Sequence, residues 1–431
     1  MDQSDSKVLV IVPEWLDRVK LVQDELKKLQ KMIVLGAYTD KDVEGLKIPV
    51  ISYKEFSNGP DTNPGDKIYP SDPANIIYTS GTTGLSKGVL GPHKFWLVVA
   101  EKMLEHREGG KDDIFYTFLP LYHFNGQCLT TMTALLAEAE MVLSDKFSAS
   151  RFWDEIKKCG ATQFNYLGAV IPILEKQAEK PDDINNTIKV AFGAGCPQAV
   201  MDRFEKRFGC VCLEGFGMSE IGIPVHVRVH DRRPGSCGKV LDIYEVKLVD
   251  DEDNEVPVGE PGEIIFRPKL PYTMMLEYYN MPDKTLESFR NLWYHTGDLA
   301  KKDADGYFTF VDRKKDSLRR RGENISSFEV GRAINSHPSV LESAAVAAKS
   351  ELAEDEVKIC VVLKPGMTLS PEELIHYAAD RMPYFAVPRY VEFMDSLPKT
   401  PTERVQKYQL RQAGITANTW DREKAGVEVE R

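Results

Sequence analysis

Hydrophobic and polar positions divide the chain into segments of strand and helix character that follow one another in turn. Residues 8–12 (VLVIV) form a short, fully apolar run of the kind found in buried strands of parallel sheets. Residues 16–32 have helical spacing, and residues 33–36 (IVLG) read as the next strand. Strand-like runs return at 161–166, 188–192 and 210–213. This alternation predicts an α/β fold with a parallel sheet.

The pattern changes after residue 235. Residues 244–249 (YEVKLV) alternate, residues 250–254 favour a turn, and residues 262–266 (GEIIF) form another strand-like run. Such spacing predicts antiparallel hairpins, and we expect a small barrel-like part there. The fold class we predict is therefore α/β, with a large N-terminal domain of parallel-type sheets and helices plus this barrel-like part.

A second boundary lies near residues 312–316. Beyond it the patterns predict a helix at 328–337, strands at 343–348 and 356–363, a helix at 371–381 and a strand at 390–393. These elements would form a small α+β C-terminal domain of about one hundred residues. We expect a large domain over 1–312 and a small, mobile one over 313–431. The polar stretch 416–431 is expected to fray.

Composition narrows the possible partners and compartment. The chain has 431 residues, 42% of them hydrophobic, and 55 Lys and Arg against 66 Asp and Glu, which leaves a net charge of −11. An acidic whole disfavours a nucleic-acid partner but permits a local basic pocket. Seven Cys without a C-x-x-C pair favour reduced thiols in the cytoplasm. We expect no secretory leader and no membrane-spanning helix.

A loop of hydroxyls and glycines follows the strand-like run at residues 75–78. It contains Thr79, Ser80, Gly81, Thr82, Thr83 and Gly84, and Lys87 comes three residues later. A Walker A loop needs Gly directly before the Lys, and Ser86 stands there instead. Even so, glycines let backbone N–H groups approach an anion and Lys supplies charge for phosphate oxygens. The loop indicates phosphate binding, and a flexible connector is the less favoured interpretation.

Further motifs carry a resemblance that covers essentially the whole chain. They are YTSGTTGLSKG (78–88), LPLYHFNG (119–126), FGAG (192–195), GFGMSE (215–220), YHTGDL (294–299), DRKKDSLRRRGENISSFEV (312–330) and LPKTPTERVQK (397–407). In this order they resemble the motifs of the adenylate-forming (AMP-binding) superfamily. Within it the chain is most similar to acyl-CoA synthetases, including the carnitine/crotonobetaine-CoA ligase group.

The resemblance implies an AMP-forming acid–thiol ligase that uses ATP, Mg²⁺ and coenzyme A and acts on a fatty or similar acid. It implies catalytic roles for Lys87, Glu220, Lys315 and Arg404, with Glu220 also holding the metal ion. It implies nucleotide or coenzyme contacts by Thr79, Ser80, Gly81, Thr82, Thr83, Gly84, Lys87, Gly193, Ala194, Gly195, Gly215, Phe216, Gly217, Ser219, Asp298, Arg313 and Gly322. It places Tyr122, His123, Phe124 and Asn125 at the acyl pocket.

Several of these residues have plainer interpretations. Glu220 could be a solvated residue at a helix start, Phe216 and His123 could be core residues, and Asp298 could serve a Gly-Asp turn. Six basic side chains in residues 313–321 could form a solvated face or lie near the 3′-phosphate of coenzyme A. The spacing His226-x-x-x-His230 is metal-like, but it lacks a third ligand, so we reject a zinc site.

Two departures from the resemblance bear on function. The late motif usually carries Gly-Lys, and this chain has Glu403-Arg404. Relatives also carry a long stretch before the point that corresponds to this chain's start, so the chain is a fragment or a partner, such as another copy, supplies the missing wall. The alternative function is thus a catalytically weakened nucleotide- or acyl-CoA-binding relative. A peptide-synthetase adenylation module is disfavoured because no room remains for a carrier domain, and luciferase chemistry stays open.

Overall fold

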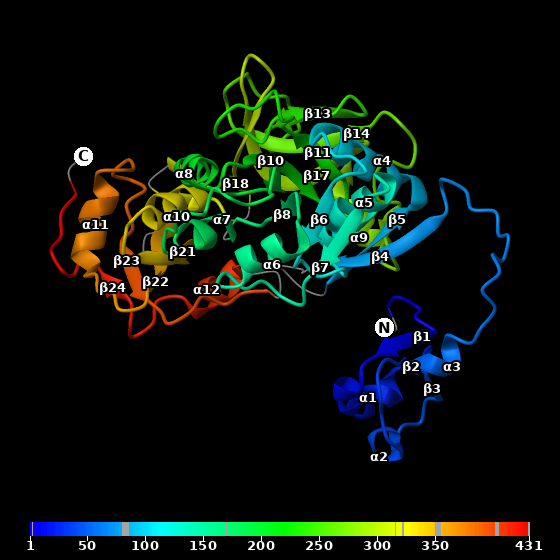
Figure 1. Cartoon of the computed structure of the whole chain (residues 1–431). Coiled ribbons are helices and arrows are strands. Elements are labelled where there is room, and N and C mark those ends of the chain that lie inside the picture. The colour runs from blue at the N-terminus through cyan, green and yellow to red at the C-terminus, as the bar shows by residue number, and fades with distance from the viewer. Residues whose placement is uncertain are drawn as a thin grey trace.

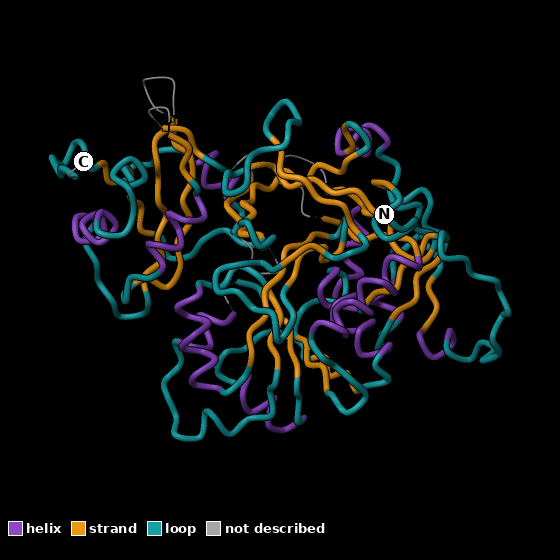
Figure 2. Tube along the Cα trace, turned by 90° about the horizontal axis from the view of Figure 1, so that it is seen from above, coloured by secondary structure: helices purple, strands orange, loops and turns teal. Residues whose placement is uncertain are grey.

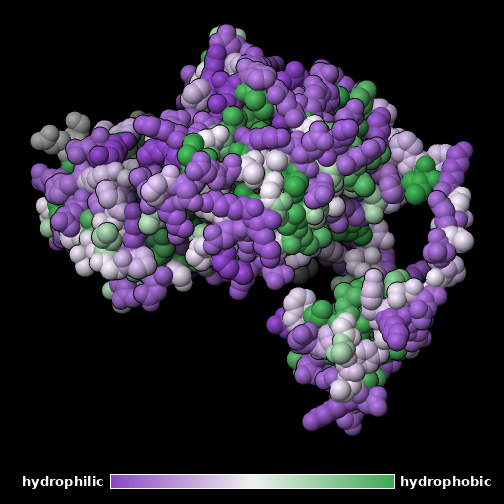
Figure 3. All heavy atoms as spheres, viewed as in Figure 1, coloured by the Kyte–Doolittle hydropathy of each residue, from purple (hydrophilic) through white to green (hydrophobic). Residues whose placement is uncertain are grey.

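The computed structural model describes residues 1, 3–79, 86–168, 170–314, 316–320, 323–349, 355–400 and 405–429. Figure 1 shows a large body, a C-terminal part at one end of it, and a small N-terminal unit joined to the body by an extended stretch of chain. This unit projects from the body, whose visible face is largely hydrophilic (Figure 3), and contacts it where the Tyr279 hydroxyl donates to Asp5 Oδ2 at 2.8 Å. The candidate site therefore depends on the body and the C-terminal part.

The N-terminal unit is a small parallel sheet with short helices. Its elements are β1 (Val8–Ile11), η1 (Pro13–Trp15), α1 (Leu16–Val22), η2 (Gln23–Glu25), β2 (Lys31–Val34), α2 (Asp40–Val43), β3 (Val50–Ser52) and α3 (Tyr53–Phe56), with strand order β1-β2-β3. The two predicted strands are confirmed. The predicted helix over 16–32 is wrong, because α1 ends at Val22 and residues 31–34 pair in parallel with β1, where Met32 is fully buried.

A seven-stranded sheet forms the centre of the body. Its strands are β6 (Ile114–Thr117), β7 (Glu140–Leu143), β8 (Gln163–Asn165), β9 (Val190–Gly193), β10 (Val211–Met218), β11 (Gly222–His226) and β12 (Lys239–Val240). The order is β12-β11-β10-β9-β8-β6-β7, and the five strands from β10 to β7 run parallel. The predicted parallel sheet is confirmed, and the carboxyl ends of its strands meet at one edge.

Helices cover both faces of this sheet (Figure 2). They are α4 (His93–His106), the π-helix η3 (Asn125–Met132), α5 (Thr133–Leu136), α6 (Phe152–Cys159), α7 (Val170–Glu175) and α8 (Gln198–Phe208). Alternate residues of β9 point to opposite faces: Ala191 packs in the core under α6, α7 and α8, while Val190 and Phe192 pack in the core under α4 and η3. Burial on both sides explains why these strands are continuously apolar.

Antiparallel sheets complete the body. Strands β4 (Pro73–Thr79), β5 (Lys87–Pro92) and β15 (Glu277–Tyr278) form one sheet. Strands β13 (Tyr244–Val249), β14 (Gly262–Pro268), β17 (Trp293–Lys302), β16 (Phe289–Arg290) and β18 (Phe308–Arg313) form another, and α9 (Pro282–Ser288) lies between β15 and β16 in the chain. The predicted hairpin pairs as β13 with β14, so the expected barrel-like part is confirmed as a curved antiparallel sheet.

The C-terminal part is an α+β unit with its own core. It contains β19 (Leu318–Arg320), β20 (Glu323–Ile325), α10 (Ser327–Asn335), β21 (Val340–Lys349), β22 (Asp355–Leu363), α11 (Pro371–Ala379), β23 (Tyr390–Phe393), α12 (Lys407–Ala413) and β24 (Trp420–Asp421). Its four-stranded sheet has the order β21-β22-β23-β24. The expectation that 416–431 frays is wrong for residues 420–421, because β24 pairs with β23 and Arg389 binds Asp421.

The two parts meet at the end of β18. Asp312 Oδ2 accepts hydrogen bonds from Ser327 N at 2.5 Å and Ser327 Oγ at 2.7 Å, so the last residues of β18 stabilise the N-terminus of α10. Lys176 Nζ, just after α7, donates to Val340 O at 3.1 Å. The domain boundary at 312/313 stays a prediction. Within the described residues, no helix has the length and apolar character needed to cross a membrane.

Candidate active site

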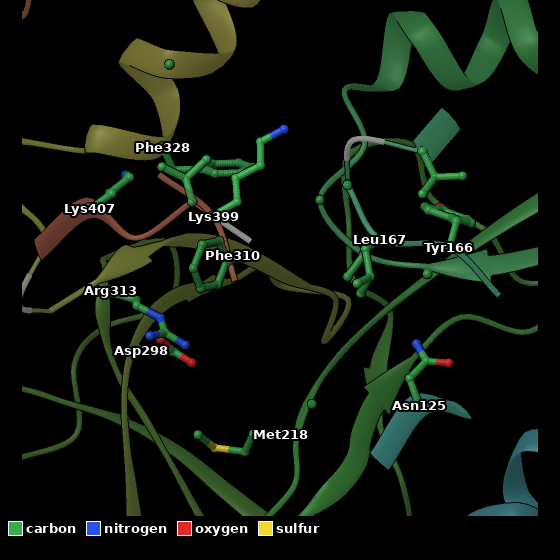
Figure 4. A pocket seen from close by; sticks show the side chains of 18 of the residues that line it. Asn125, Tyr166, Leu167, Met218, Asp298, Phe310, Arg313, Phe328, Lys399 and Lys407 are labelled. Carbon is green, nitrogen blue, oxygen red and sulfur yellow. The ribbon is translucent and has the colours of Figure 1, made fainter. Parts of the chain in front are cut away.

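A cavity of about 2190 Å³ lies where the carboxyl ends of the parallel strands face the C-terminal part. Its walls include the segments that follow β6, β8 and β9, the end of β10, and residues from α10 and the 399–411 region. Figure 4 shows side chains from both parts directed into it. In open α/β sheets ligands bind at this edge. The cavity exceeds an ordinary small-molecule pocket of about 300–1,000 Å³, so it has room for more than one reactant.

The predicted phosphate loop closes the hairpin of β4 and β5. Thr79 and Lys87 are register partners, and Thr79 Oγ1 donates to Lys87 O at 3.4 Å. Both residues line the cavity. Ser80, Gly81, Thr82, Thr83 and Gly84 lie outside the described residues. The hairpin thus carries the lysine into the cavity wall beside the predicted loop.

Lys87 lies beside a buried carboxylate. Its Nζ is 4.1 Å from the centroid of the Tyr278 ring, and the Tyr278 hydroxyl donates to Glu220 Oε1 at 2.8 Å. Burial lowers the pKa of Lys87 below its ordinary value, and the negative charge of Glu220 opposes that shift. The Glu220 side chain is buried rather than solvated, which disagrees with the interpretation as a solvated helix-start residue. A cation and an anion are therefore held in fixed positions at one side of the cavity.

Tyr278 and Tyr294 support this carboxylate. Their hydroxyls are 3.2 Å apart, and both rings are buried. Burial raises the pKa of each phenol, so both remain protonated and Tyr278 can donate to Glu220. A carboxylate oriented in this way is a hard oxygen ligand of the type that Mg²⁺ prefers. Glu220 would therefore be able to supply an oxygen ligand to a magnesium ion, which stays a prediction.

Asp298 and Arg313 lie at a second wall. They are cross-strand partners on β17 and β18, and Arg313 Nε is 3.4 Å from Asp298 Oδ1. Asp298 is only 7% exposed, and Figure 4 shows both side chains directed into the cavity. A carboxylate held by a guanidinium can accept hydrogen bonds from a diol without a large cost of burial. Asp298 lies within β17, which disagrees with its plainer interpretation as a turn residue.

The predicted glycines allow backbone segments to approach one another closely. A Cβ on Gly193 would lie 2.4 Å from Tyr166 Cδ2, and a Cβ on Gly217 would lie 2.2 Å from Gly222 O. Gly195 has φ +80°, in the left-handed region that favours glycine. Gly193, Ala194, Gly195, Gly215, Gly217 and Ser219 line the cavity. Their contacts with a nucleotide stay a prediction.

The structure differs from the expectation at two aromatic residues. Phe216 is not among the described residues that line the cavity, because its ring packs into the core, stacked 6.2 Å from Phe266. Met218 presents its side chain there instead (Figure 4). Tyr122 is 59% exposed and is likewise absent from the described cavity wall. The centroid of its ring lies 4.7 Å from that of His123, which does line the cavity.

Three predicted acyl-pocket residues do line the cavity. They are His123, Phe124 and Asn125. Burial lowers the pKa of His123, which favours the neutral imidazole. Phe124 also packs 5.0 Å from Trp96, so it belongs to the core and to the wall at once. Asn125 begins η3 and accepts a hydrogen bond from Asn165 Nδ2 at 2.7 Å.

The C-terminal part contributes cationic side chains that were not predicted as site residues, among them Lys407 and Lys399. Lys407 lines the cavity, and its Nζ donates to Ser327 Oγ at 2.7 Å. Burial lowers the pKa of Lys407, and the negative charges of Asp312 and Asp316 oppose that shift. Lys399 also lines the cavity and pairs with Glu342 at 2.8 Å. Both lysines belong to the motif at 397–407, which is the signal that could have identified them.

Other predicted residues lie elsewhere. Lys315, Gly322 and Arg404 fall outside the described residues. His226 ends β11 and stacks on His106 at a ring distance of 4.0 Å, whereas His230 is exposed and contacts Glu108. The two histidines therefore lie in different surroundings.

The fold and cavity define a two-part α/β protein with paired charges suited to a nucleotide. Comparisons with known protein families identify the family. Residues 1–279 match the model of the AMP-binding enzyme family, and residues 329–404 match the AMP-binding enzyme C-terminal domain. The chain belongs to the AMP-binding enzyme family.

Curated relatives and solved structures agree with this membership. Crotonobetaine/carnitine–CoA ligases of Salmonella heidelberg and Salmonella typhimurium are each 33% identical over 347 residues, which is 79% of this chain and 66% of the relative. The chain thus spans just under two thirds of their length. The anthranilate CoA ligase AuaEII, solved with anthranoyl-AMP, is 26% identical with a TM-score of 0.86, covering 95% of this chain and 79% of that one.

A more distant structure shows the same fold. The O-succinylbenzoate coenzyme A synthetase MenE from Bacillus subtilis, solved with ATP and a magnesium ion, is 22% identical with a TM-score of 0.77. It covers 94% of this chain and 89% of that one. The adenylate-forming fold predicted from the motifs is therefore confirmed.

Proposed function

We propose that this protein is an ATP-dependent acid–CoA ligase. In the first half-reaction a carboxylate oxygen attacks the α-phosphorus of ATP, forming acyl-AMP and releasing pyrophosphate. In the second, the thiol of coenzyme A attacks the acyl carbon and AMP leaves. The observation that carries the proposal is one cavity at the edge where the C-terminal part meets the body. It holds the half-buried Lys87 near the buried carboxylate of Glu220, and an Asp–Arg ion pair at another wall.

Charge neutralisation is the main demand of the first half-reaction, because the acid and the triphosphate are both anions. Lys87 supplies a cation at the wall where the predicted phosphate loop begins and ends. Burial lowers the pKa of this side chain, and the negative charge of Glu220 opposes that shift. A lysine ammonium is a donor for phosphate oxygens. Lys87 would therefore orient the leaving pyrophosphate.

Glu220 would hold the magnesium ion. A buried carboxylate next to a triphosphate is repulsive unless a cation separates them, and Tyr278 fixes its orientation through a 2.8 Å hydrogen bond. When bound, Mg²⁺ neutralises phosphate charge and orients the nucleotide. The chain's own contribution is to position that carboxylate and to keep water away with Tyr278 and Tyr294.

Asp298 and Arg313 would bind the ribose. A carboxylate accepts from both hydroxyls of a diol, and Arg313 holds the carboxylate at the wall. The acid would lie near His123, Phe124 and Asn125, on the wall formed after β6. Solved relatives carry anthranoyl-AMP or ATP with a magnesium ion, which supports ATP, Mg²⁺ and an acyl-adenylate as ligands here.

The C-terminal part would exchange reactants between the two half-reactions. Lys315 is the expected hinge, and Gly322 would border the tunnel for coenzyme A. Lys407 and Lys399 already face the cavity in the present arrangement, so a rotation of this part would change which side chains meet the reactants. A homo-oligomer that completes the acyl wall stays a prediction.

Acid-dependent exchange of radiolabelled pyrophosphate into ATP tests the proposal. Exchange with at least one acid, followed by coenzyme A-dependent AMP release, supports an acid–CoA ligase. The panel would include crotonobetaine, carnitine, anthranilate, O-succinylbenzoate and straight-chain fatty acids. Binding of ATP without exchange by any acid would instead favour the catalytically weakened relative, which Arg404 in place of the usual Lys suggests.

A further inference from the structure

A continuous chain of hydrogen-bonded side chains links a buried arginine to the acyl wall. Arg107 Nη1 donates to Asn165 Oδ1 at 2.8 Å, and Asn165 Nδ2 donates to Asn125 Oδ1 at 2.7 Å. Arg107 and Asn165 are 2% and 1% exposed, whereas Asn125 lines the cavity. The last amide of the chain is therefore the one that a ligand can reach.

The chain has one possible direction. A guanidinium only donates hydrogen bonds, so the atom of Asn165 that faces Arg107 must be its oxygen. The nitrogen of Asn165 then faces Asn125, and it also donates to Thr130 Oγ1 at 2.9 Å. The hydrogen bond from Asn165 Nδ2 occupies the amide oxygen of Asn125. The amide N–H groups of Asn125 are left for the cavity, and in Figure 4 its nitrogen lies on the side of Leu167.

Arg107 is fixed and charged. It also donates from Nε to Gln163 Oε1 at 2.9 Å, and it lies 5.5 Å and 5.7 Å from the ring centroids of Phe115 and Phe192. Burial lowers its pKa to about 9, which still leaves it protonated at neutral pH, and the charge of Asp113 opposes the shift. Rotating the Asn165 amide by half a turn would point its N–H groups at this cation. Arg107, a cation that cannot accept a hydrogen bond, therefore sets the direction of the hydrogen bonds from Asn165 to Asn125.

Local backbone geometry also fixes Asn125. It begins the π-helix η3, a rare element that is often found at functional sites. The next residue, Gly126, lies so close to the preceding segment that a Cβ would be 2.7 Å from both Leu119 O and Pro120 O. The start of η3 therefore presses against the segment after β6, which holds the Asn125 side chain in the wall.

We propose that Asn125 Nδ2 is a specificity-determining donor in the acyl pocket, oriented by the positioning residues Asn165 and Arg107. The acid it selects carries an oxygen acceptor, such as a carbonyl or hydroxyl, on its acyl chain. The inference rests on the proposed function. In Figure 4 Asn125 lies across the cavity from Asp298 and Arg313, so it meets the chain of the acid while the carboxylate faces the nucleotide.

Matched acids test this inference. Levulinate is compared with valerate, and the oxo acids one and two methylenes longer are compared with hexanoate and heptanoate. In the wild type at least one oxo acid should have a kcat/KM about tenfold above its hydrocarbon partner, the value of one net hydrogen bond of about 1.4 kcal/mol. Asn125→Leu should bring that ratio to about one, mainly through KM. If kcat/KM falls by the same factor for the oxo acid and its hydrocarbon partner in Asn125→Leu, or falls for neither, their ratio is unchanged and the inference is overturned.

The positioning roles have a separate readout. Arg107→Met frees the Asn165 amide to rotate and should lower the acid ratio, and Arg107→Lys should restore part of it because an ammonium also only donates. Variants that merely lose stability would lower activity with both acids and leave the ratio unchanged, which would overturn the role of Arg107. His230→Phe, at an exposed histidine, serves as the matched control.

Failure of the ligase proposal gives a different result. If no acid supports pyrophosphate exchange, the same acid pairs are compared by calorimetry with the wild type in the presence of AMP. A preference for the oxo acids that disappears in Asn125→Leu supports the inference even without turnover. Binding of both acids with equal affinity overturns it.

Discussion

Arg313 lies opposite Asp298 on neighbouring antiparallel strands, and its Nε is 3.4 Å from Asp298 Oδ1. The two residues are the terminal register partners of β17 and β18, and both line the cavity. Their ion pair therefore joins the two strands and also shapes the site. Because Arg313 comes one residue after Asp312, which stabilises the start of α10, this wall of the cavity is directly connected to the C-terminal part.

Asp298→Asn should weaken AMP binding by about 10- to 100-fold, since hydrogen bonds to a charged group contribute about 1.5–3 kcal/mol each. Calorimetric titration with AMP measures the loss. Asp305→Asn is the control, because Asp305 lies on the turn between the same strands and its partner is the exposed Arg233. Equal affinities of the wild type and Asp298→Asn would show that the ribose does not reach this residue.

Glu220→Gln should reduce acid-dependent pyrophosphate exchange by about 100-fold or more, as when a single electrostatic contact in a preorganised site is removed. The amide has nearly the same shape, and its oxygen can still accept from Tyr278, so the fold should persist. The magnesium concentration required for half-maximal exchange should rise as well. Tyr278→Phe keeps the charge of Glu220 and should give a smaller loss. A normal magnesium dependence in Glu220→Gln would remove Glu220 from the metal site.

Acid should destabilise the protein through two stacked histidines. His106 and His226 lie 4.0 Å apart between ring centroids, and the pKa of His106 is lowered to about 4 by burial and by Arg228. The pKa of His226 is lowered as well, mainly by burial. Below about pH 6.5 the unfolded chain takes up protons that the folded chain refuses, so stability falls as the pH decreases from 6.5 toward 4.

The slope is on the order of 1.4 kcal/mol per pH unit for each histidine. Urea unfolding at pH 7 and pH 5 measures it. His106→Phe should remove about half of the slope, whereas His230→Phe should leave it unchanged because His230 is exposed beside Glu108. If the free energy of unfolding depends on pH equally in the wild type and in His106→Phe, groups other than His106 cause the acid sensitivity.

The sequence predicted those strands that are defined by a local run, or a local alternation, of apolar residues. The apolar runs became strands β1, β8 and β9, and the alternating run 244–249 became β13. The helix expected over 16–32 ends early because residues 31–34 pair in parallel with β1. Pairing with residues distant in the sequence cannot be recognised from the spacing of apolar residues within one segment.

The candidate site was only partly predictable for the same reason. The loop before Lys87, the acid at Glu220 and the Asp298–Arg313 pair belong to motifs with recognisable chemistry. The chain from Arg107 to Asn125 does not, because its members come from a loop, β8 and η3, with Arg107 and Asn165 separated by 58 positions. Phe216 packs in the core, the plainer of its two interpretations, and the sequence could not decide between them because an aromatic residue between two glycines gives no sign of which side of its strand is the core.

Arg404→Lys should increase the rate of pyrophosphate exchange by about tenfold, equivalent to about 1.4 kcal/mol of transition-state stabilisation. The physical reason is that a compact ammonium donates at one point between a carboxylate and a phosphate, whereas a planar guanidinium spreads its charge and its donors.

Thioester formation from preformed acyl-AMP and coenzyme A should not change in this variant, because the motif resemblance implies a role for residue 404 in the first half-reaction only. Single-turnover measurements separate the two steps. Arg381→Lys, at the surface beside Tyr377, is the matched control. An Arg404→Lys variant with the wild-type exchange rate would mean that another cation already serves the first half-reaction. Lys407 would then be the residue to test, since it is half-buried and lines the cavity.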